Sequence, residues 1–368
     1  MLWHERSRSA LAVGGILVAI LLIFLQLGFY TSVPRGGLLF YNAMRFDLML
    51  TSSAYVYQAQ SAGFPRRRLF QALALPEVAA ASAVYQDTAL WLNADAHVRR
   101  DIFVLAFDPR LVVFENAEIN RQIDVVQQYD TLLVDSASIA EFGALTTGRR
   151  VEIDKRSVII GGTYRLGIGF VGLGVGLTSD QNFIRLFPNR SLSDVNLGLL
   201  TLQSGAHPAT VAERLRQILP VDTRVFTRHE LTAHETDHWV RRTSTGLIFG
   251  FGVIVAFVVG LVILNQTLST QITQQLPQYA TLKAMGYGDG ALAGIVTSLA
   301  IIMTTISYFP AAALAVFIYS LIRNATTLPV EMTAFRMFAV LAMAWAMAAL
   351  SALAALRVLR RADPVELF

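Results

Sequence analysis

Residues 246–264 read GLIFGFGVIVAFVVGLVIL, a run of nineteen residues without a charged side chain. A helix needs about 20 apolar residues to cross the hydrocarbon core of a bilayer, so this run predicts a transmembrane helix. Similar runs occur at residues 10–30, 291–322 and 335–356. One run therefore lies near the N-terminus and three follow residue 245 in quick succession. About 210 residues of ordinary globular sequence separate the first run from the second.

This spacing predicts a membrane α-helical protein with four transmembrane helices, one plus three, and a large extracytoplasmic α+β domain between helices 1 and 2. The expected segments are a cytoplasmic amphipathic N-terminus (1–9), helix 1 (10–30), the α+β domain with a juxtamembrane stalk (31–243), helix 2 (244–264), a cytoplasmic loop (265–290), helix 3 (291–322), a short periplasmic loop (323–333), helix 4 (334–356) and a cytoplasmic tail (357–368).

The segment between the first two spans carries separate strand and helix patterns. Strict alternation of strand and helix is missing, which argues against a parallel dinucleotide-binding sheet and favours an α+β fold. We expect strands at 46–50, 101–107, 131–134, 151–153, 157–160 and 196–202, and helices at 66–75, 136–142 and 208–219.

Composition supports a membrane protein. The chain is 54% hydrophobic and 15% charged, against about 25% charged residues in typical soluble domains. The absence of cysteine excludes disulfides, thiolate metal sites and a cysteine nucleophile. The net charge of +4 comes from Lys and Arg near the apolar runs, which is a membrane pattern and not a nucleic-acid footprint.

Charge near the spans predicts the orientation. The first run has an apolar core too long for a signal peptide and no small-residue cleavage site after it, so we expect an uncleaved helix. Lys and Arg favour the cytoplasmic side, which places the α+β domain in the periplasm of a multi-pass inner-membrane protein. Arg241, Arg242, Arg323 and Arg336 depart from this rule, and we expect their side chains to snorkel to lipid headgroups. The residues that set the orientation are Arg6, Arg8, Lys283, Arg357, Arg360 and Arg361.

Three features concern how the spans connect and pack. Residues 229–245 contain no Gly or Pro, so we expect a helix that runs directly into the second span. Pro310 interrupts the long third run, where a proline can kink a helix. Small residues allow close helix contact, and they are Gly250, Gly252, Gly260, Ala311, Ala312 and Ala313.

Residues 234–238 spell HExxH, the pattern of zinc proteases. On a helix His234 and His238 would share a face, and Glu235 could act as a general base. The alternative is an ordinary polar helix next to the membrane, because Trp239 and Arg241 follow directly. We favour this alternative and expect no catalytic or metal site, with incidental zinc binding at His234 and His238 left open.

Residues 167–172 spell GxGxxG within a glycine-rich run. A dinucleotide site needs a helix directly after this motif, and here more glycine follows, so we expect a loop and no cofactor. The sequence also lacks GxxxxGK[ST], and the spans carry no ionisable residue at their centres. Any energy for transport must therefore come from another subunit.

Residues 276–287, LPQYATLKAMGY, predict a short helix between the second and third spans. Pro277 suits its first turn and Gly286 suits the position just after its end. Tyr279, Leu282 and Met285 would share one apolar face. The segment is either a simple interfacial connector or a peg that docks into a partner.

At this point the chain resembles the FtsX/MacB-like permeases of ABC transporters, and most of all their DevC-type branch, over nearly its whole length. The motifs that carry the resemblance are GLIFGFG (246–252), VVGLVI (258–263), LPQYATLKAMGY (276–287), LTSD (177–180), FIRLFP (183–188) and the ending RRADPVELF (360–368).

The resemblance implies the partners and the function. It implies a homodimer of permeases, each with a separate ABC ATPase subunit that binds ATP and Mg, a periplasmic membrane-fusion adaptor and a TolC-like outer-membrane channel. The chain itself would be no enzyme. Its implied role is export of a lipid, glycolipid or other amphiphile by mechanotransmission. Two alternatives stay open: an FtsX-like transducer that activates a periplasmic partner without export, and a lipoprotein-extraction permease.

The resemblance also implies which residues meet the ATPase. Related permeases carry acids where Gln271, Gln275 and Gln278 stand, so a salt bridge at these positions is replaced here by an uncharged contact. The implied coupling residues are Leu276, Pro277, Gln278, Tyr279, Thr281, Leu282, Lys283, Met285, Gly286 and Tyr287, with a further C-terminal contact at Asp363, Pro364 and Phe368.

Overall fold

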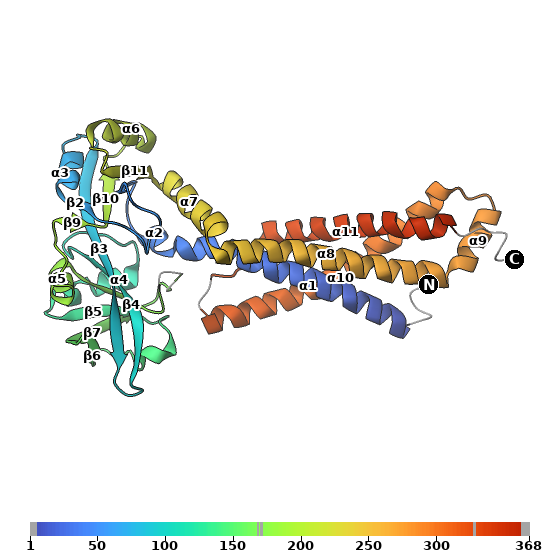
Figure 1. Cartoon of the computed structure of the whole chain (residues 1–368), viewed down its shortest axis with the longest axis horizontal. Coiled ribbons are helices and arrows are strands. Elements are labelled where there is room, and N and C mark those ends of the chain that lie inside the picture. Colours follow the sequence, from blue (N-terminus) through green and yellow to red (C-terminus); the bar gives the residue numbers. More distant parts are fainter. Residues whose placement is uncertain (1–5, 168, 170–171, 327–328, 362–368) are drawn as a thin grey trace. The chain divides into compact units, whose positions relative to one another are not determined.

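The computed structural model describes residues 6–167, 169, 172–326 and 329–361 of the chain (Figure 1). The chain divides into two units. The membrane unit holds residues 1–32, 244–326 and 330–368, and the α+β domain holds residues 33–243 and 327–329.

Long apolar helices build the membrane unit. They are α1 (Arg6–Gly37), α8 (Ser244–Gln274), α10 (Asp289–Thr326) and α11 (Ala334–Arg361), and the short α9 (Leu276–Ala284) lies between α8 and α10 in sequence. Within the described residues, the segments long and apolar enough to cross a membrane are Val13–Gly37, Ser244–Gln274, Gly290–Arg323 and Ala334–Ala355. The predicted one-plus-three fold with an α+β domain between the first two spans is confirmed.

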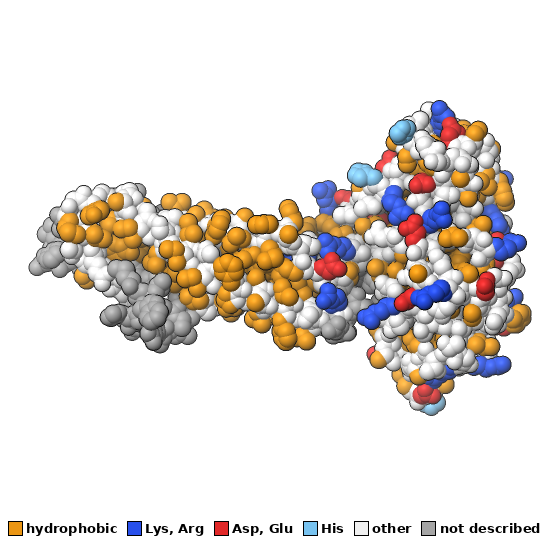
Figure 2. Space-filling view, turned by 180° about the vertical axis from the view of Figure 1, so that it is seen from behind, with side chains coloured by type: hydrophobic (Ala, Val, Ile, Leu, Met, Phe, Trp, Pro, Cys, Tyr) orange, Lys and Arg blue, Asp and Glu red, His pale blue; other side chains and the backbone are white. Residues whose placement is uncertain are grey.

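The four long helices pack around one apolar core. Its buried members include Ile20 and Phe24 of α1, Leu264 of α8, Met303 of α10 and Val340 of α11. The outward face of α8 is also apolar, and Leu247, Ile248, Phe251 and Ile254 there are each at least 60% exposed. Figure 2 shows such hydrophobic side chains covering the helices. A helix that is apolar on its exposed face is expected where lipid is the solvent.

Small residues bring the helices close together, as predicted. A Cβ at Gly252 would overlap Gln26 of α1, and a Cβ at Gly260 would press on Met347 of α11. Ala311 and Ala312 are buried, whereas Ala313 is exposed. α10 stays helical through Pro310 and extends over 38 residues. It is therefore about 57 Å long at 1.5 Å per residue, which exceeds a single membrane crossing.

A mixed sheet forms the α+β domain, in the order β11-β1-β10-β3-β4-β8-β5-β7-β6. β6 also pairs with β3, so β3, β4, β8, β5, β7 and β6 close into a ring. The pairs β4–β8 and β5–β7 are parallel and the others are antiparallel. The strands are β1 (Leu48–Ser52), β3 (Val78–Asn93), β4 (Val98–Phe107), β5 (Thr131–Asp135), β6 (Arg150–Ile153), β7 (Arg156–Tyr164), β8 (Val175–Ser179), β10 (Leu197–Leu202) and β11 (Thr223–Thr227), and β2 (Phe64–Pro65) pairs separately with β9 (Asp194–Val195).

Helices and turns cover this sheet. They are α2 (Leu39–Ala43), α3 (Arg67–Leu73), α4 (Ala117–Arg121), α5 (Asp180–Leu186), α6 (Pro208–Ile218) and α7 (Arg228–Asp237), two 3₁₀ turns, η1 (Ile123–Gln127) and η2 (Ala140–Phe142), and a π-helical turn, η3 (His238–Arg242).

Both faces of the sheet are buried. Along β4, Ile102 and Val104 point into one core while Phe103 and Leu105 point into a second core on the other face. This follows from the period of two in a strand, where successive side chains face opposite sides. The second core also contains Phe40 and Tyr41 of α2 and Leu231 of α7. The elements that begin and end the domain therefore rest on the same face of the sheet.

Two local predictions are wrong. The helix expected at 136–142 is a turn followed only by η2, because the Asp135 carboxylate accepts the Ala137 amide at 2.8 Å and holds the chain in a tight turn. The continuous helix expected at 229–245 is also absent. α7 ends at Asp237, η3 follows, and Thr243 is extended with ψ 147°. Trp239 is buried in this segment, and its packing overrides simple helical continuation.

The packing of Trp91 allows a test of the closed ring of strands. Trp91 is 1% exposed, and its Nε1 donates to the Phe142 carbonyl at 3.2 Å. We predict that Trp91→Ala destabilises the α+β domain by about 3–5 kcal/mol. Amide hydrogen exchange on the full-length protein should then speed up more than about 100-fold in β4.

The matched control is Trp345→Ala on α11, where the indole is 44% exposed. This variant should leave exchange in β4 unchanged. Equal protection of β4 in Trp91→Ala and in the unmodified protein would show that the ring does not depend on Trp91.

Candidate functional site

The predicted helix between the second and third spans is present as α9. Pro277 lies in its first turn, where the missing amide costs nothing. At its end the Tyr287 amide donates to the Leu282 carbonyl at 3.2 Å and the Gly286 amide donates to the Lys283 carbonyl at 3.0 Å. Gly286 has φ +92°. This pair of bonds is a Schellman motif, whose left-handed residue favours glycine.

The two faces of α9 have different surroundings. Tyr279 is 5% exposed and packs into the core of the membrane unit, and Leu282 is half-buried against the same core. Met285 is 62% exposed and Tyr287 is 51% exposed. The apolar face expected from Tyr279, Leu282 and Met285 is therefore not one docking surface, because two of its three members hold α9 to its own bundle.

The other residues predicted to couple to an ATPase lie as follows. Lys283 is half-buried, as are Gln271 and Gln275, the two positions before α9 where related permeases carry acids. Leu276 begins the helix. Pro277, Gln278, Thr281 and Gly286 are exposed, and Asp363, Pro364 and Phe368 lie outside the described residues. The exposed residues predicted to couple are thus polar on α9 itself and apolar in the turn directly after it, at Met285 and Tyr287.

The α+β domain has a second notable region, where its first and last helices meet. Arg228, at the start of α7, donates through Nη2 to the carbonyls of Met44 at 2.9 Å and Phe46 at 3.0 Å. Its guanidinium also lies 4.1 Å above the Phe46 ring. A guanidinium with several carbonyl partners fixes the backbone that it bonds. α7 is therefore tied to the segment that directly follows α2.

Trp239 closes the same region from the other end of α7. Its ring packs against Gly37, where a Cβ would overlap the indole. Tyr57 lies edge-on to Trp239 at 5.6 Å and stacks on His238 at 4.4 Å. We call this region the junction and define it by Gly37, Arg228, Glu235 and Trp239, together with the side chains that they contact.

The HExxH residues lie in the junction and point in three directions. His234 Nε2 lies 3.0 Å from the Val56 carbonyl, and His238 lies on Tyr57. Glu235 is fully buried and accepts a hydrogen bond from the Tyr55 hydroxyl. Within the described part of the chain, no three His, Asp or Glu side chains gather closely enough to hold a metal. The buried Glu235 carboxyl contacts the Tyr55 hydroxyl and not solvent. This geometry does not fit a zinc protease, whose glutamate acts on water.

Burial is the largest influence on the pKa of the Glu235 carboxyl. Removal from water raises the pKa of Glu235 to about 7, and hydrogen bonds from Tyr55, Trp239 and the Gln58 amide offset part of the effect. Burial also raises the pKa of Tyr55 and Tyr41 well above their ordinary value. The pKa of His238 is lowered, first by burial and then by the charge of His234.

Of the glycine-rich motif, the structure describes Gly167, Gly169 and Gly172, and none of these lies in a helix or strand. Asp135 Oδ2 accepts the amides of Leu166 at 3.1 Å and Gly167 at 2.8 Å. Residues 168, 170 and 171 lie outside the described residues. After Gly172 the chain enters β8, which is a strand. The helix that a dinucleotide site requires does not follow the motif.

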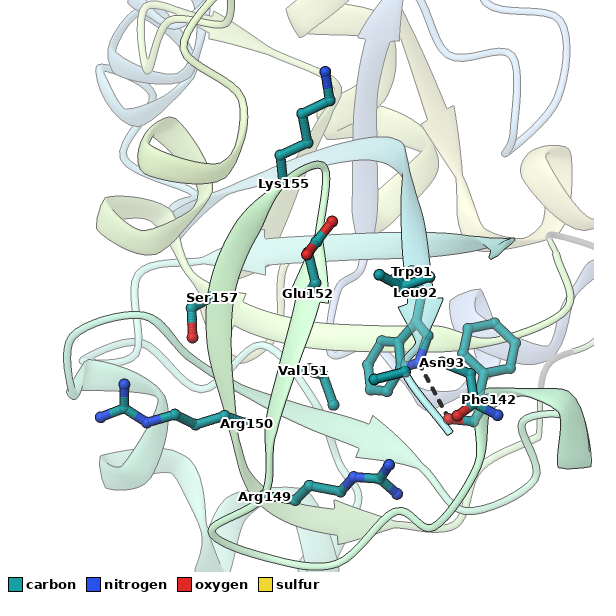
Figure 3. A pocket seen from close by; sticks show the side chains of 11 residues that line it. Trp91, Leu92, Asn93, Phe142, Arg149, Arg150, Val151, Glu152, Lys155 and Ser157 are labelled. Carbon is teal, nitrogen blue, oxygen red and sulfur yellow. Dashed lines mark hydrogen bonds between the residues drawn. The ribbon is translucent and has the colours of Figure 1, made fainter. Parts of the chain in front are cut away.

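A cavity of about 310 Å³ lies beside β6 (Figure 3). Arg149 at its edge is already paired with Asp95 at 2.5 Å. In Figure 3, Arg150 and Lys155 point away from each other and from the Trp91 side of the cavity. Polar groups that do not converge give a ligand no fixed partner, so we assign no binding role to this cavity.

A buried arginine lies in the membrane unit, where the sequence predicted a side chain at the lipid headgroups. Arg336 was expected to snorkel, but it is 2% exposed. It donates to Thr31 Oγ1 of α1 and to the Glu331 carbonyl, and it lies 5.3 Å from the Tyr319 ring of α10. Arg336 therefore links three helices at one end of the bundle. An arginine in the first turn of a helix whose next twenty residues carry no charge was the signal available in the sequence.

The fold and α9 together define a class: multi-span membrane proteins with a large domain inserted after the first span and a short helix between later spans. Residues 250–364, which include α9 and most of the last three spans, match the family model for the FtsX-like permease C-terminal domain. Over these residues the chain is similar to FtsX-like permeases.

Two solved structures are similar to part of this chain. The periplasmic region of MacB from Actinobacillus actinomycetemcomitans matches at 8% identity and a TM-score of 0.36, over 49% of this chain and 87% of that chain. The extracellular domain of the noncanonic ABC-type transporter YknZ from Gram-positive bacteria matches at 10% identity and a TM-score of 0.34, over 49% and 99%. No curated protein matches the sequence significantly.

The contact between Gly37 and Trp239 generates a prediction for the junction. A methyl group at position 37 must displace the indole, and overpacking of this kind costs about 1–3 kcal/mol. Gly37→Ala should therefore speed up amide exchange across residues 228–242 by about 10- to 100-fold.

Gly14→Ala is the matched control, because it lies in the same helix and a Cβ there meets no atom within 4 Å. It should leave exchange across residues 228–242 unchanged. Equal exchange in both variants would mean that Trp239 does not hold α7 in place.

Proposed function

We propose that this chain is the permease subunit of an ATP-driven ABC exporter of the mechanotransmission type, of the DevC-type branch. The observation that carries the proposal is the family match over residues 250–364, with α9 inside it. The cargo class that we favour is a lipid, glycolipid or other amphiphile, because the spans present apolar side chains and no central ionisable residue.

ATP hydrolysis belongs to a partner in this proposal. The sequence has no GxxxxGK[ST] motif, so ATP and Mg would bind to a separate ABC ATPase subunit. We assign to that partner the exposed side of α9 together with the turn that directly follows it, residues 285–287. It offers Met285 and Tyr287 as large exposed apolar groups and Gln278 as an uncharged hydrogen-bonding group.

Because the end of α9 is held rigidly, the surface beside it is suited to transmit force. Tyr279 and Leu282 anchor α9 to the bundle, and the Schellman motif fixes the direction in which Met285 and Tyr287 leave it. A push on α9 would therefore be passed to α8 and α10, which flank it in sequence. Exposed apolar side chains on a fixed turn are also typical anchors of protein interfaces.

The remaining partners follow from the expected topology. A second copy of the chain would complete the transporter. A periplasmic membrane-fusion adaptor and a TolC-like channel would take the cargo onward from the inner membrane. The bias of Lys and Arg toward one side of the spans supports a periplasmic position of the α+β domain.

The test is to purify the permease with the ABC ATPase from the same gene neighbourhood in lipid nanodiscs and to measure ATP hydrolysis. We predict that Met285→Asp combined with Tyr287→Asp lowers permease-stimulated hydrolysis at least about tenfold, because buried charges at an interface core weaken binding by more than about 1.4 kcal/mol.

Val221→Asp supplies the control, since Val221 is an apolar residue of the α+β domain that is 96% exposed. It should leave hydrolysis unchanged. Leu282→Asp is unsuitable as a probe, because Leu282 packs against the membrane core and its loss would damage the fold. Full stimulation by the double variant would refute the coupling role of α9. Stimulation without movement of lipid or glycolipid would favour an FtsX-like transducer over an exporter.

A further inference from the structure

One buried carboxyl in the α+β domain joins three segments of chain. Glu235 of α7 is 0% exposed. Its Oε1 accepts a hydrogen bond from the Tyr55 hydroxyl, and the Tyr55 and Tyr41 hydroxyls share a further bond. Tyr41 lies in α2 and Tyr55 lies in the loop after β1, and both are buried. The chain of three side chains therefore holds α7 against the rest of the domain.

The charged groups around this carboxyl are all engaged elsewhere. On α7, Arg228 bonds backbone carbonyls and His234 contacts the Val56 carbonyl. In η3, Arg241 and Arg242 pair with Asp237 at 3.4 Å each. His238 stacks on Tyr57. Over the described residues, no Lys or Arg forms a salt bridge with Glu235.

A buried carboxylate without a cation is costly, whereas the neutral acid is not. The hydrogen bonds from Tyr55, Trp239 and the Gln58 amide stabilise the charged form only in part, and the pKa of Glu235 stays at about 7. When α7 is released, the carboxyl meets water and its pKa returns toward the ordinary value of 4.5. The docked position of α7 thus favours the protonated acid and the released position favours the carboxylate.

We propose that Glu235 is a proton-operated latch: protonation holds α7 onto Tyr55 and α2, and ionisation loosens it. The latch does not depend on the exporter function proposed above, because it rests on contacts within the α+β domain alone. Its contribution to docking is complete below about pH 4.5 and is lost as the pH rises through about 7. A domain outside the cytoplasm would experience such changes directly.

The test uses the full-length protein in lipid nanodiscs. The chain has no cysteine, so spin labels can be placed at two exposed positions, Ala59 in the loop and Ala233 on α7, through Ala→Cys substitutions. Electron–electron double resonance then measures the distance distribution between the labels. We expect one narrow distribution at pH 5.5 and a broader one at pH 8, with a midpoint near pH 7.

Variants separate the latch from other titrating groups. Glu235→Gln keeps the shape of the side chain without its charge, so the distribution should stay narrow at both pH values. Tyr55→Phe removes a donor that stabilises the carboxylate, so the midpoint should move to higher pH. The combined variant His234→Gln and His238→Gln should keep the midpoint of the unmodified protein.

Each result decides the proposal. A pH-independent distribution in the unmodified protein would overturn it. A transition that persists in Glu235→Gln, or that disappears in the histidine variant, would assign the titration to another group. An unmoved midpoint in Tyr55→Phe would show that Glu235 does not act through the tyrosine pair.

Discussion

The α+β domain depends on the close contact between Gly37 and Trp239. Gly37 ends the first long helix and Trp239 lies just before the last span, so this contact joins the two places where the chain enters and leaves the domain. Arg228 and Glu235 reinforce it through backbone carbonyls and through the Tyr55–Tyr41 pair. Because α2 and α7 both contribute to the second core, a shift of either connection is felt by the same face of the sheet.

The break in the helix after α7 changes how movement of the spans could reach the α+β domain. A single rigid helix through residues 229–245 would have worked as a lever, but Thr243 is extended and η3 is wound more widely than an α-helix. Extended residues and π turns are places where a chain can bend at low cost, and such turns often accompany function. In the mechanotransmission that we propose, the junction therefore takes the place of a continuous helix.

The sequence predicted the features that rest on local pattern. Long apolar runs gave the four spans, and Pro277 with Gly286 gave both ends of α9. β3 escaped notice because its first half, VAAASA, has low strand propensity and owes its form to pairing with β4 and β10. The exposure of Met285 and the burial of Tyr279 and Arg336 depend on distant helices, so no local pattern could reveal them.

The central claim is that the exposed turn directly after α9 meets an ABC ATPase. The most direct measurement is site-specific cross-linking in a chain that has no native cysteine. A thiol-linked photocrosslinker at Met285→Cys or Tyr287→Cys should give a covalent adduct with the ATPase in membranes, and the same probe at Val221→Cys should give none. Absence of the adduct at positions 285 and 287, or equal labelling at 221, would contradict the account.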